Sequence, residues 1–365
     1  MKYFIITLLA AIAFTGCKTK NDGFSIIGHI EGIKDSTLIT LYDLDQQINL
    51  DSAYSSNGNF TLSGKVEHPS SCWIQCENEY ANIQVENLEM SFHSPLKNMH
   101  LNCSISGGKE QDLQNELKNL QQVYDQAYID ALDHFMKKKY SSDEEKLSLI
   151  MKINNSQTAS HDVYVDFGKK HADSYMGLNI VYKNRNSIER DTLTAIYENL
   201  PPAMKNTSTA KALNVYLFEE VAKVGNPFID FEVSTIDGDD FRLSSLKGEY
   251  IYLCFWSAGC GPCRMENKYL SEHFTEIPEN LSIVSFSVDK NANTWKSASE
   301  RDHISWHNIS DMEGSKGRIK TQYQVQAIPT SYLIDKNGRI IKKFKGYDPK
   351  GNIIEKLKNI IDELE

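Results

Sequence analysis

The motif Cys260-Gly261-Pro262-Cys263 constrains this chain more than any other feature of its sequence. It directly follows an apolar run from Tyr250 to Phe255, which has the length and composition of a buried strand. After the motif, apolar residues recur at helical spacing, at Met265, Tyr269, Leu270 and Phe274. The sequence therefore predicts a strand, a tight turn and a helix, with both cysteines at the start of the helix.

A cysteine at the start of a helix is favoured as a thiolate. The first helical turn has unpaired backbone N–H groups and the positive end of the helix dipole, and both stabilise negative charge. Such positions lower a cysteine pKa from about 8.5 to about 7 or below. We therefore expect Cys260 to be the attacking nucleophile. Cys263 lies one turn later on the same face, close enough to form a disulfide with Cys260, and is expected to be the resolving thiol.

A structural disulfide or half of a zinc site would use the same motif. Zinc needs two further ligands, and this half of the chain has no second CxxC and no well-spaced Cys/His pair. Elsewhere, His93, His100 and Cys103 have a spacing that fits no common metal site, and His303 with His307 lacks a third ligand. A redox role is therefore favoured, and no metal site is expected.

A second, independent signal is Ala327-Ile328-Pro329-Thr330, because a proline just before an apolar strand is a candidate for a cis peptide bond. With the CGPC motif, it makes the chain resemble the thioredoxin superfamily. Within that superfamily, the chain is most similar to exported, membrane-anchored thiol–disulfide oxidoreductases of the TlpA/ResA type. The resemblance covers residues from about 225 to 365, and it is carried by Gly225-Asn226-Pro227-Phe228 with Phe231, Leu243-Ser244-Ser245-Leu246-Lys247-Gly248, Phe255-Trp256, Cys260-Gly261-Pro262-Cys263-Arg264-Met265-Glu266 and Ile328-Pro329-Thr330.

The resemblance implies an α/β thioredoxin-like domain, with a central mixed sheet flanked by helices, and no cofactor beyond the redox-active disulfide between Cys260 and Cys263. It also implies that Trp256 and the Pro329 loop shape the groove in which the substrate docks. Glu266 matches a glutamate that this family carries three residues after the second cysteine. There it would lie beneath the disulfide, tune the thiols and shuttle the proton of Cys263. The alternative for Glu266 is an exposed acid stabilised by the N-terminus of the helix.

One departure from the resemblance concerns the strand before the motif. Thioredoxin usually has a buried aspartate six positions before its first active cysteine, and Cys254 holds that position here. The proton-accepting carboxylate is therefore missing from the strand. Cys254 is expected to be a small core residue rather than a third redox thiol.

The N-terminus predicts export. Met1-Lys2 precedes an apolar run from Phe4 to Phe14, which is too short to span a membrane but suits a signal peptide. The sequence Phe14-Thr15-Gly16-Cys17 resembles a bacterial lipobox, which implies that Cys17 carries a lipid, while Ala11-Ile12-Ala13 leaves an ordinary signal-peptidase site open. We expect a signal peptide with lipobox at 1–17 and a polar tether at 18–23. The net charge of −10 argues against a nucleic-acid partner.

Residues 24–107 predict a small β-sandwich-like domain, because short runs alternate apolar and polar residues and Asn57-Gly58 is a strong hairpin turn. Cys72 and Cys76 would lie about 13 Å apart on one strand, too far for a disulfide. A bond from Cys103 to either one stays open, although buried thiols are favoured. The region resembles the β-rich domain of unknown function that precedes thioredoxin modules in many bacterial lipoproteins, through Gly28-His29-Ile30-Glu31-Gly32, Leu41-Tyr42-Asp43 and Asp51-Ser52-Ala53.

Residues 108–223 predict helices, of which the first is long and amphipathic, with apolar residues every three or four positions from Leu113 to Phe135. These helices are expected to pack on the β domain or to pair with a second copy in a homodimer. The change to Gly225-Asn226-Pro227 marks the beginning of the thioredoxin-like domain at 224–365. Asp348-Pro349 is expected to cap its final helix.

These observations predict a periplasm-facing, lipid-anchored thiol–disulfide oxidoreductase that reduces disulfides in exported proteins and is recharged by a membrane electron donor. A peroxiredoxin is disfavoured, because its Pro-x3-Thr-x2-Cys signature requires Pro and Thr at the positions of Leu253 and Ser257. The other alternative is a binding or scaffold lipoprotein in which the thioredoxin-like module is secondary.

Overall fold

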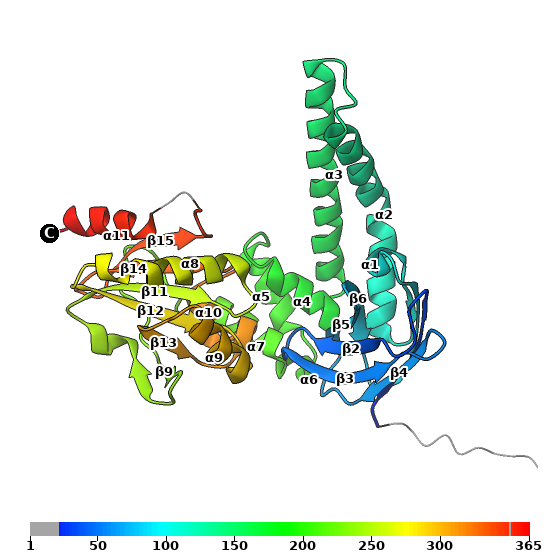
Figure 1. Ribbon diagram of the computed structural model, residues 1–365, viewed down its shortest axis with the longest axis horizontal. Coiled ribbons are helices and arrows are strands. Elements are labelled where there is room, and N and C mark those ends of the chain that lie inside the picture. Colours follow the sequence, from blue (N-terminus) through cyan, green and yellow to red (C-terminus); the bar gives the residue numbers. More distant parts are fainter. Residues whose placement is uncertain (1–21, 350–351) are drawn as a thin grey trace, which may run out of the picture.

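Strands β1 to β8 form two four-stranded sheets that share one core. The computed structural model describes residues 22–349 and 352–365, and Figure 1 draws these first strands in blue and cyan. One sheet has the strand order β4 (Asn59–Gly64), β1 (Phe24–Glu31), β7 (Glu89–Pro95), β8 (Ser104–Ser106), with the short helix α1 (Met99–Asn102) before β8. The other has the order β3 (Ile48–Tyr54), β2 (Leu38–Asp43), β5 (Ser70–Cys76), β6 (Glu79–Val85).

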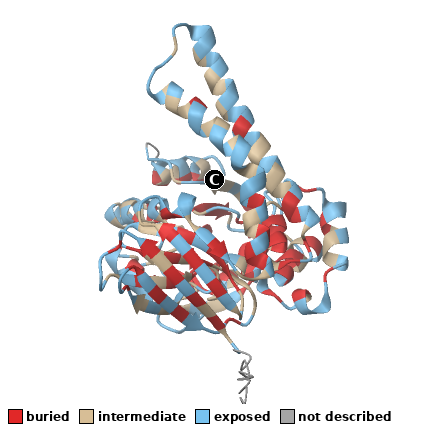
Figure 2. Ribbon diagram, turned by 90° about the vertical axis from the view of Figure 1, so that its right-hand side faces the viewer, coloured by how far each residue is buried: buried red, intermediate tan, exposed pale blue. Residues whose placement is uncertain are grey.

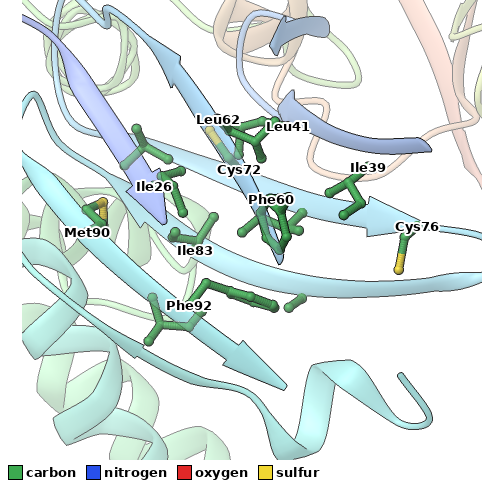
Figure 3. Packing of buried hydrophobic residues seen from close by; sticks show 14 of the residues in the cluster. Ile26, Ile39, Leu41, Phe60, Leu62, Cys72, Cys76, Ile83, Met90 and Phe92 are labelled. Atoms are coloured by element: carbon green, nitrogen blue, oxygen red, sulfur yellow. The ribbon is translucent and has the colours of Figure 1, made fainter. Parts of the chain in front are cut away.

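The core of this sandwich follows from the alternation of its strands. In β1, Phe24, Ile26 and Ile30 point inward, while Ile27 is exposed. Figure 3 shows side chains from both sheets meeting in one layer, and they belong to a single buried cluster. Each fully buried large aliphatic side chain stabilises such a core by about 1.5–3 kcal/mol. The apolar faces of the two sheets therefore hold the domain together.

The three cysteines of this domain are free thiols, so the predicted buried thiols are confirmed and a disulfide to Cys103 is wrong. Cys72 and Cys76 are buried in the sandwich core, and Cys103 is partly buried. Burial raises the pKa of the Cys76 thiol to about 11 and raises that of Cys72 as well. Both thiols therefore stay protonated and unreactive at neutral pH.

Two long helices form an antiparallel hairpin that projects from the sandwich (Figure 1). They are α2 (Lys109–Met136), which confirms the predicted long helix, and α3 (Asp143–Lys170). Ser142 caps α3 by accepting a hydrogen bond from the backbone N–H of Glu145 at 3.2 Å. Figure 2 shows that the outer half of the hairpin is mostly exposed or half-buried.

Four shorter helices lie between the sandwich and the C-terminal domain (Figure 1). The Glu110 carboxylate at the start of α2 accepts hydrogen bonds from the backbone N–H groups of Tyr175 and Met176, at 3.1 and 2.8 Å. On the other side, the Tyr182 and Thr321 hydroxyls are 3.0 Å apart. This helical layer therefore connects the two sheet domains, and its elements are α4 (Tyr175–Lys183), α5 (Arg190–Glu198), α6 (Pro202–Lys205) and α7 (Ser208–Phe218).

The C-terminal domain is built on one seven-stranded mixed sheet. Its order is β10 (Asp240–Arg242), β9 (Glu232–Thr235), β13 (His307–Ser310), β12 (Leu281–Ser287), β11 (Tyr250–Trp256), β14 (Thr330–Ile334), β15 (Ile340–Lys345). The central strand β11 is parallel to β12 and antiparallel to β14, and all seven of its residues are buried. Both faces of this strand are therefore covered, which accounts for its unbroken apolar sequence.

Helices cover the two faces of this sheet (Figure 1). Tyr252 and Cys254 of β11 pack toward α8 (Gly261–Glu272) and α11 (Ile353–Asp362), whereas Leu253 and Phe255 face α10 (Arg318–Gln322). Asn352 caps α11 by accepting a hydrogen bond from the N–H of Glu355 at 3.0 Å. The predicted cap at Asp348-Pro349 is therefore wrong, because the helix begins only at Ile353. The remaining elements are η1 (Leu243–Leu246), η2 (Phe274–Glu276), η3 (Gly314–Lys316) and α9 (Ala292–Arg301).

The predicted fold class is confirmed: an α/β thioredoxin-like domain with a central mixed sheet follows a small β sandwich and a helical segment. The predicted signal peptide, the lipobox with Cys17 and most of the tether lie outside the described residues. Across the part of the chain that the structure describes, no helix combines the length and the apolar character needed to cross a lipid bilayer.

Candidate active site

The central strand β11 delivers the CGPC motif to one edge of the sheet. The strand ends at Trp256, and α8 begins at Gly261, directly after Cys260. Cys260 is the N-cap of α8, and its Sγ accepts a hydrogen bond from the backbone N–H of Cys263 at 3.2 Å. The fixed φ of Pro262 suits the first turn of the helix. The sulfur of Cys260 therefore lies where helix N–H groups and the helix dipole favour negative charge.

The structure shows the oxidised form of the motif. Cys260 and Cys263 are joined by a disulfide, with their Cα atoms 5.2 Å apart. The two sulfurs differ in access, because Cys260 is half-buried while Cys263 is only 1% exposed. An incoming molecule can therefore reach the sulfur of Cys260 but not that of Cys263.

The proline loop lies directly against the outer cysteine. The peptide bond between Ile328 and Pro329 is cis, as the sequence suggested. The carbonyl oxygen of Ile328 is 3.7 Å from Cys260 Sγ. Pro329 itself is buried, and Ala327, two residues before it, is exposed. The proline loop therefore borders the accessible sulfur of Cys260 on one side.

Glu266 lies one turn after Cys263 on α8 and is only 5% exposed, so the alternative of an exposed acid is wrong. Its Oε1 accepts hydrogen bonds from the Tyr252 hydroxyl at 2.8 Å and from the Cys254 thiol at 3.5 Å. Ser331 in turn donates to the Tyr252 hydroxyl at 2.8 Å. Burial raises the pKa of Glu266, and the two donors offset part of that rise. The carboxyl can therefore take up or release a proton nearer neutral pH than an exposed glutamate can.

Trp256 does not line a docking groove, and this part of the prediction is wrong. Its side chain is fully buried, at 0% exposure. It packs in one cluster with Cys263, Trp295 and Ala298. Because β11 is covered on both faces as far as its last residue, the ring lies behind the disulfide and supports the inner cysteine from within.

Asp289 is a site residue that the sequence interpretation missed. It follows β12, which runs parallel to β11, so both strands end at the same edge of the sheet. Its carboxylate accepts hydrogen bonds from the backbone N–H of Ala258 at 2.9 Å and from the Ser287 hydroxyl at 2.7 Å. Burial raises the pKa of Asp289, while these hydrogen bonds lower it. An acid directly after the strand that pairs with β11 was the signal that could have identified it.

A second missed feature is the ion pair between Arg264 and Asp302. Arg264 donates to Asp302 through Nε and through Nη2, the latter at 2.7 Å, and its Nη1 is 3.3 Å from the carbonyl oxygen of Ala258. The Asp302 side chain is fully buried, and that of Arg264 is 18% exposed. The loop before Cys260 is therefore held from both sides, by Asp289 at the N–H of Ala258 and by Arg264 at its carbonyl.

The histidine pairs singled out in the sequence do not form a site. His303 has a left-handed backbone just after α9, and His307 begins β13, so the two do not share a helix. His93 pairs with Glu31 at 3.3 Å and stacks on His29. Within residues 22–349 and 352–365, no group of three or more His, Cys, Asp or Glu side chains has the arrangement of a metal site.

Two family models match the chain. Residues 224–343 match the AhpC/TSA family, and residues 24–114 match a domain of unknown function named DUF4369. The first covers the seven-stranded sheet as far as β15, and the second covers the sandwich and the beginning of α2. The second match agrees with the resemblance seen in the N-terminal sequence.

Curated relatives share the C-terminal domain. The thiol–disulfide oxidoreductase ResA of Bacillus thuringiensis subsp. konkukian is 32% identical over 143 residues, which are 39% of this chain and 81% of the relative. ResA of Geobacillus thermodenitrificans is 27% identical over 148 residues, which are 40% of this chain and 83% of the relative.

Among solved structures, the thioredoxin domain of a thiol–disulfide oxidoreductase from Bacteroides vulgatus is similar, at 24% identity and a TM-score of 0.34, over 39% of this chain and 98% of that one. The C-terminal domain thus shares 32% of its residues with ResA of Bacillus thuringiensis over 81% of that relative's length. Through its C-terminal domain, the chain belongs to the ResA family of thiol–disulfide oxidoreductases.

Proposed function

We propose that the protein reduces disulfides in exported proteins, with Cys260 as nucleophile and Cys263 as resolving thiol. The observation that carries this proposal is the difference between the two sulfurs. Cys260 is accessible, caps a helix and lies 3.7 Å from the carbonyl of Ile328 before the cis proline, whereas Cys263 is buried behind it. An attacking thiolate needs access and stabilised charge, and a resolving thiol needs only contact with its partner.

The reaction transfers two electrons from the enzyme to the substrate. In the reduced enzyme, the Cys260 thiolate attacks one sulfur of the substrate disulfide, that disulfide breaks, and the other substrate sulfur leaves as a thiolate and takes up a proton. Cys263 then loses its proton and attacks Cys260 Sγ. The mixed disulfide breaks, the second substrate thiol is released, and the enzyme is left with the Cys260–Cys263 disulfide.

Glu266 is the proposed acceptor of the Cys263 proton. It follows Cys263 by one helical turn, and both side chains face the buried side of α8. Burial raises its pKa, and a base with a pKa nearer the working pH transfers protons more effectively. The Tyr252 and Cys254 hydrogen bonds keep its carboxylate in one place between the helix and the strand.

The lipobox-like sequence at Cys17 supports action outside the cytoplasm from a lipid anchor. An exported dithiol has no access to cytoplasmic reductants, so we propose a membrane electron donor as the partner that returns the disulfide to the dithiol form. The other partners would be exported proteins with disulfides or thiols, and the projecting α2–α3 hairpin would be the contact in a homodimer.

A thiol peroxidase is the second candidate, because the AhpC/TSA model matches residues 224–343. A peroxidase would oxidise the Cys260 thiolate to a sulfenic acid with release of water or an alcohol, and Cys263 would condense with it and release water. Leu253 and Ser257 stand at the signature positions of peroxiredoxins, which favours the oxidoreductase.

The test uses the full chain, reduced and then mixed with a disulfide substrate or with hydrogen peroxide. With the disulfide, Cys263→Ser should accumulate a mixed disulfide at Cys260, and Cys260→Ser should react at neither position. Oxidation by peroxide much faster than by disulfides would favour the peroxidase, and an unreactive Cys260 in both would leave a binding protein. A reduction potential near that of thioredoxin, about −270 mV, supports a reductase, whereas one near −120 mV would reverse the proposed direction.

A further inference from the structure

The active-site edge of the C-terminal sheet carries three loops. Strands β11, β12 and β13 are parallel, so their C-terminal ends lie at one edge. The first loop leads to Cys260, the second contains Asp289 and Lys290, and the third includes η3 with Lys316. The second loop holds the first, because Asp289 accepts a hydrogen bond from the N–H of Ala258.

The turn between β2 and β3 of the N-terminal sandwich, residues 44–47, packs against this edge. The side-chain oxygen of Gln47 accepts a hydrogen bond from the backbone N–H of Lys290 at 3.0 Å. The Lys290 ammonium donates a hydrogen bond to the side-chain oxygen of Gln46 at 3.5 Å, and Asp45 forms an ion pair with Lys316. Figure 1 shows this end of the sandwich turned toward the C-terminal domain.

The Lys290 side chain is itself fixed at this contact. It crosses Gly314 so closely that a Cβ there would lie 2.7 Å from Cγ of Lys290. The Lys316 side chain is only 8% exposed, so its ion pair with Asp45 is largely shielded from water. The two domains are therefore closely packed at this contact, and its charged groups are largely buried.

The β2–β3 turn is rigid before it meets the second domain. Asp43 is buried, and its Oδ1 accepts hydrogen bonds from the backbone N–H groups of Asp45 and Gln46 at 2.8 and 2.7 Å. Its other oxygen accepts from the Ser70 hydroxyl at 2.7 Å. Gln47 has a φ of 57°, which closes the turn. A turn held in this way keeps its position when a substrate approaches.

Asp289 and Lys290 are neighbours in the loop after β12. The Asp289 carboxylate accepts a hydrogen bond from the N–H of Ala258, and the backbone N–H of Lys290 donates to the side-chain oxygen of Gln47. The N-terminal domain is thus joined to the loop before Cys260 through Asp289 and Lys290.

We propose that the β2–β3 turn is a specificity element, which forms the wall of the substrate groove opposite the cis-proline loop and admits extended disulfide-bearing segments while it excludes disulfides on folded domains. It presupposes that Cys260 reacts with disulfides, as proposed above. The proline loop lies on one side of Cys260, and the turn of the N-terminal sandwich packs on the loop of Asp289 and Lys290, which in turn holds Ala258. A folded substrate would have to displace this wall, whereas an extended segment can lie between the two sides.

The experiment compares two turn variants of the full chain that change the wall in opposite directions. Gln46→Ala with Gln47→Gly removes both side chains that hold Lys290, and glycine accepts the positive φ of position 47. Gln46→Trp enlarges the wall at an exposed position. Each protein is first reduced and freed of reductant. The second-order rate constant for oxidation of its dithiol is then measured with insulin, whose disulfides lie in a folded protein, and with oxidised glutathione.

The matched control is the β5–β6 turn, at the other end of the same sheet. Glu77 has a φ of 50° there and its neighbour Asn78 is exposed, so Glu77→Gly with Asn78→Ala, and Asn78→Trp alone, repeat the side-chain changes away from the active site. We expect the insulin-to-glutathione ratio of the rate constants to rise about fivefold in the Ala/Gly variant of the β2–β3 turn and to fall about fivefold in its Trp variant. Both control variants of the β5–β6 turn should keep the ratio of the natural chain.

The outcomes separate this inference from the proposed function. A ratio that stays constant in both turn variants, with active enzyme, overturns the specificity element and leaves the oxidoreductase intact. Equal changes in the β5–β6 control variants would also overturn it, because the effect would then come from general loosening of the sandwich. If the natural chain reduces neither substrate, the proposed function itself fails.

Discussion

The Cys254 thiol donates a hydrogen bond to Oε1 of Glu266 across 3.5 Å, from the central strand to the first helix of the C-terminal domain. The Tyr252 hydroxyl donates to the same oxygen at 2.8 Å. One buried carboxyl is thus shared by two donors of β11, on the buried side of the helix that begins with the reactive cysteines. Its protonation should control the second half of the reaction.

Replacing Glu266 by glutamine should slow the resolving step but not the attack. With an aromatic disulfide reagent that releases one coloured thiolate on attack and another on resolution, the first release should keep its rate. The second should slow about a hundredfold, the size of a lost general base. In the natural chain the second rate should rise with pH as Glu266 ionises, and this inflection should vanish in the variant. A second release that is equally fast in both proteins would remove Glu266 from the proton path.

The same Glu266→Gln variant has a stability signature that tests the burial of the carboxyl. Because burial raises the pKa of folded Glu266 above its unfolded value, folding favours the protonated form, and the free energy of unfolding falls as pH rises between the two values. The variant lacks this loss, because a glutamine side chain does not ionise. Urea unfolding at pH 5 and pH 8 should therefore show the variant gaining stability relative to the natural chain at the higher pH.

Trp256→Ala should act on stability. The side chain is fully buried against Cys263 and Trp295, so its removal should lower the free energy of unfolding by about 3–5 kcal/mol. Trp306, which is half-buried and donates to Ser285, offers a milder comparison. A free energy of unfolding that fell by less than about 1 kcal/mol, together with a higher KM for a protein substrate, would instead place Trp256 in the substrate groove.

Arg264→Ala should destabilise the domain through Asp302. The variant leaves a fully buried carboxylate without its guanidinium, and the loss of one partner of a buried pair costs about 3–5 kcal/mol. Removing both partners should cost less than removing Arg264 alone, which a double-mutant cycle in urea measures. Additive costs would show that the two side chains do not stabilise each other.

Thiol labelling should separate the six described cysteines by access and pKa. In the oxidised protein at pH 8, iodoacetamide should modify Cys103 first, because burial raises the pKa of all four free thiols but only Cys103 is partly exposed, while Cys72, Cys76 and Cys254 are buried. After reduction, Cys260 should react before all others. Mass spectrometry of the digested protein gives the order, and early modification of Cys263 would contradict the assigned roles.

Local sequence patterns were sufficient for the parts of this protein that depend on neighbouring residues. The CGPC motif predicted a cysteine at a helix start, the proline of Ile328-Pro329 suggested the cis bond, and alternation in the first hundred residues predicted the sandwich. In each case the pattern involves only residues that lie a few positions apart in the sequence, because capping, proline geometry and strand alternation act at short range.

The surroundings of the site were decided by tertiary structure. Trp256 follows a strand pattern that predicts an apolar residue, but its full burial depends on Trp295 and Ala298 from another helix. Glu266 could have been exposed or buried on the same helix, and its position under Tyr252 required the sheet beside it. The contact between Gln47 and Lys290 spans 243 positions. No local pattern encodes it, because docking of two domains depends on the shapes and charges of surfaces that exist only once each has folded.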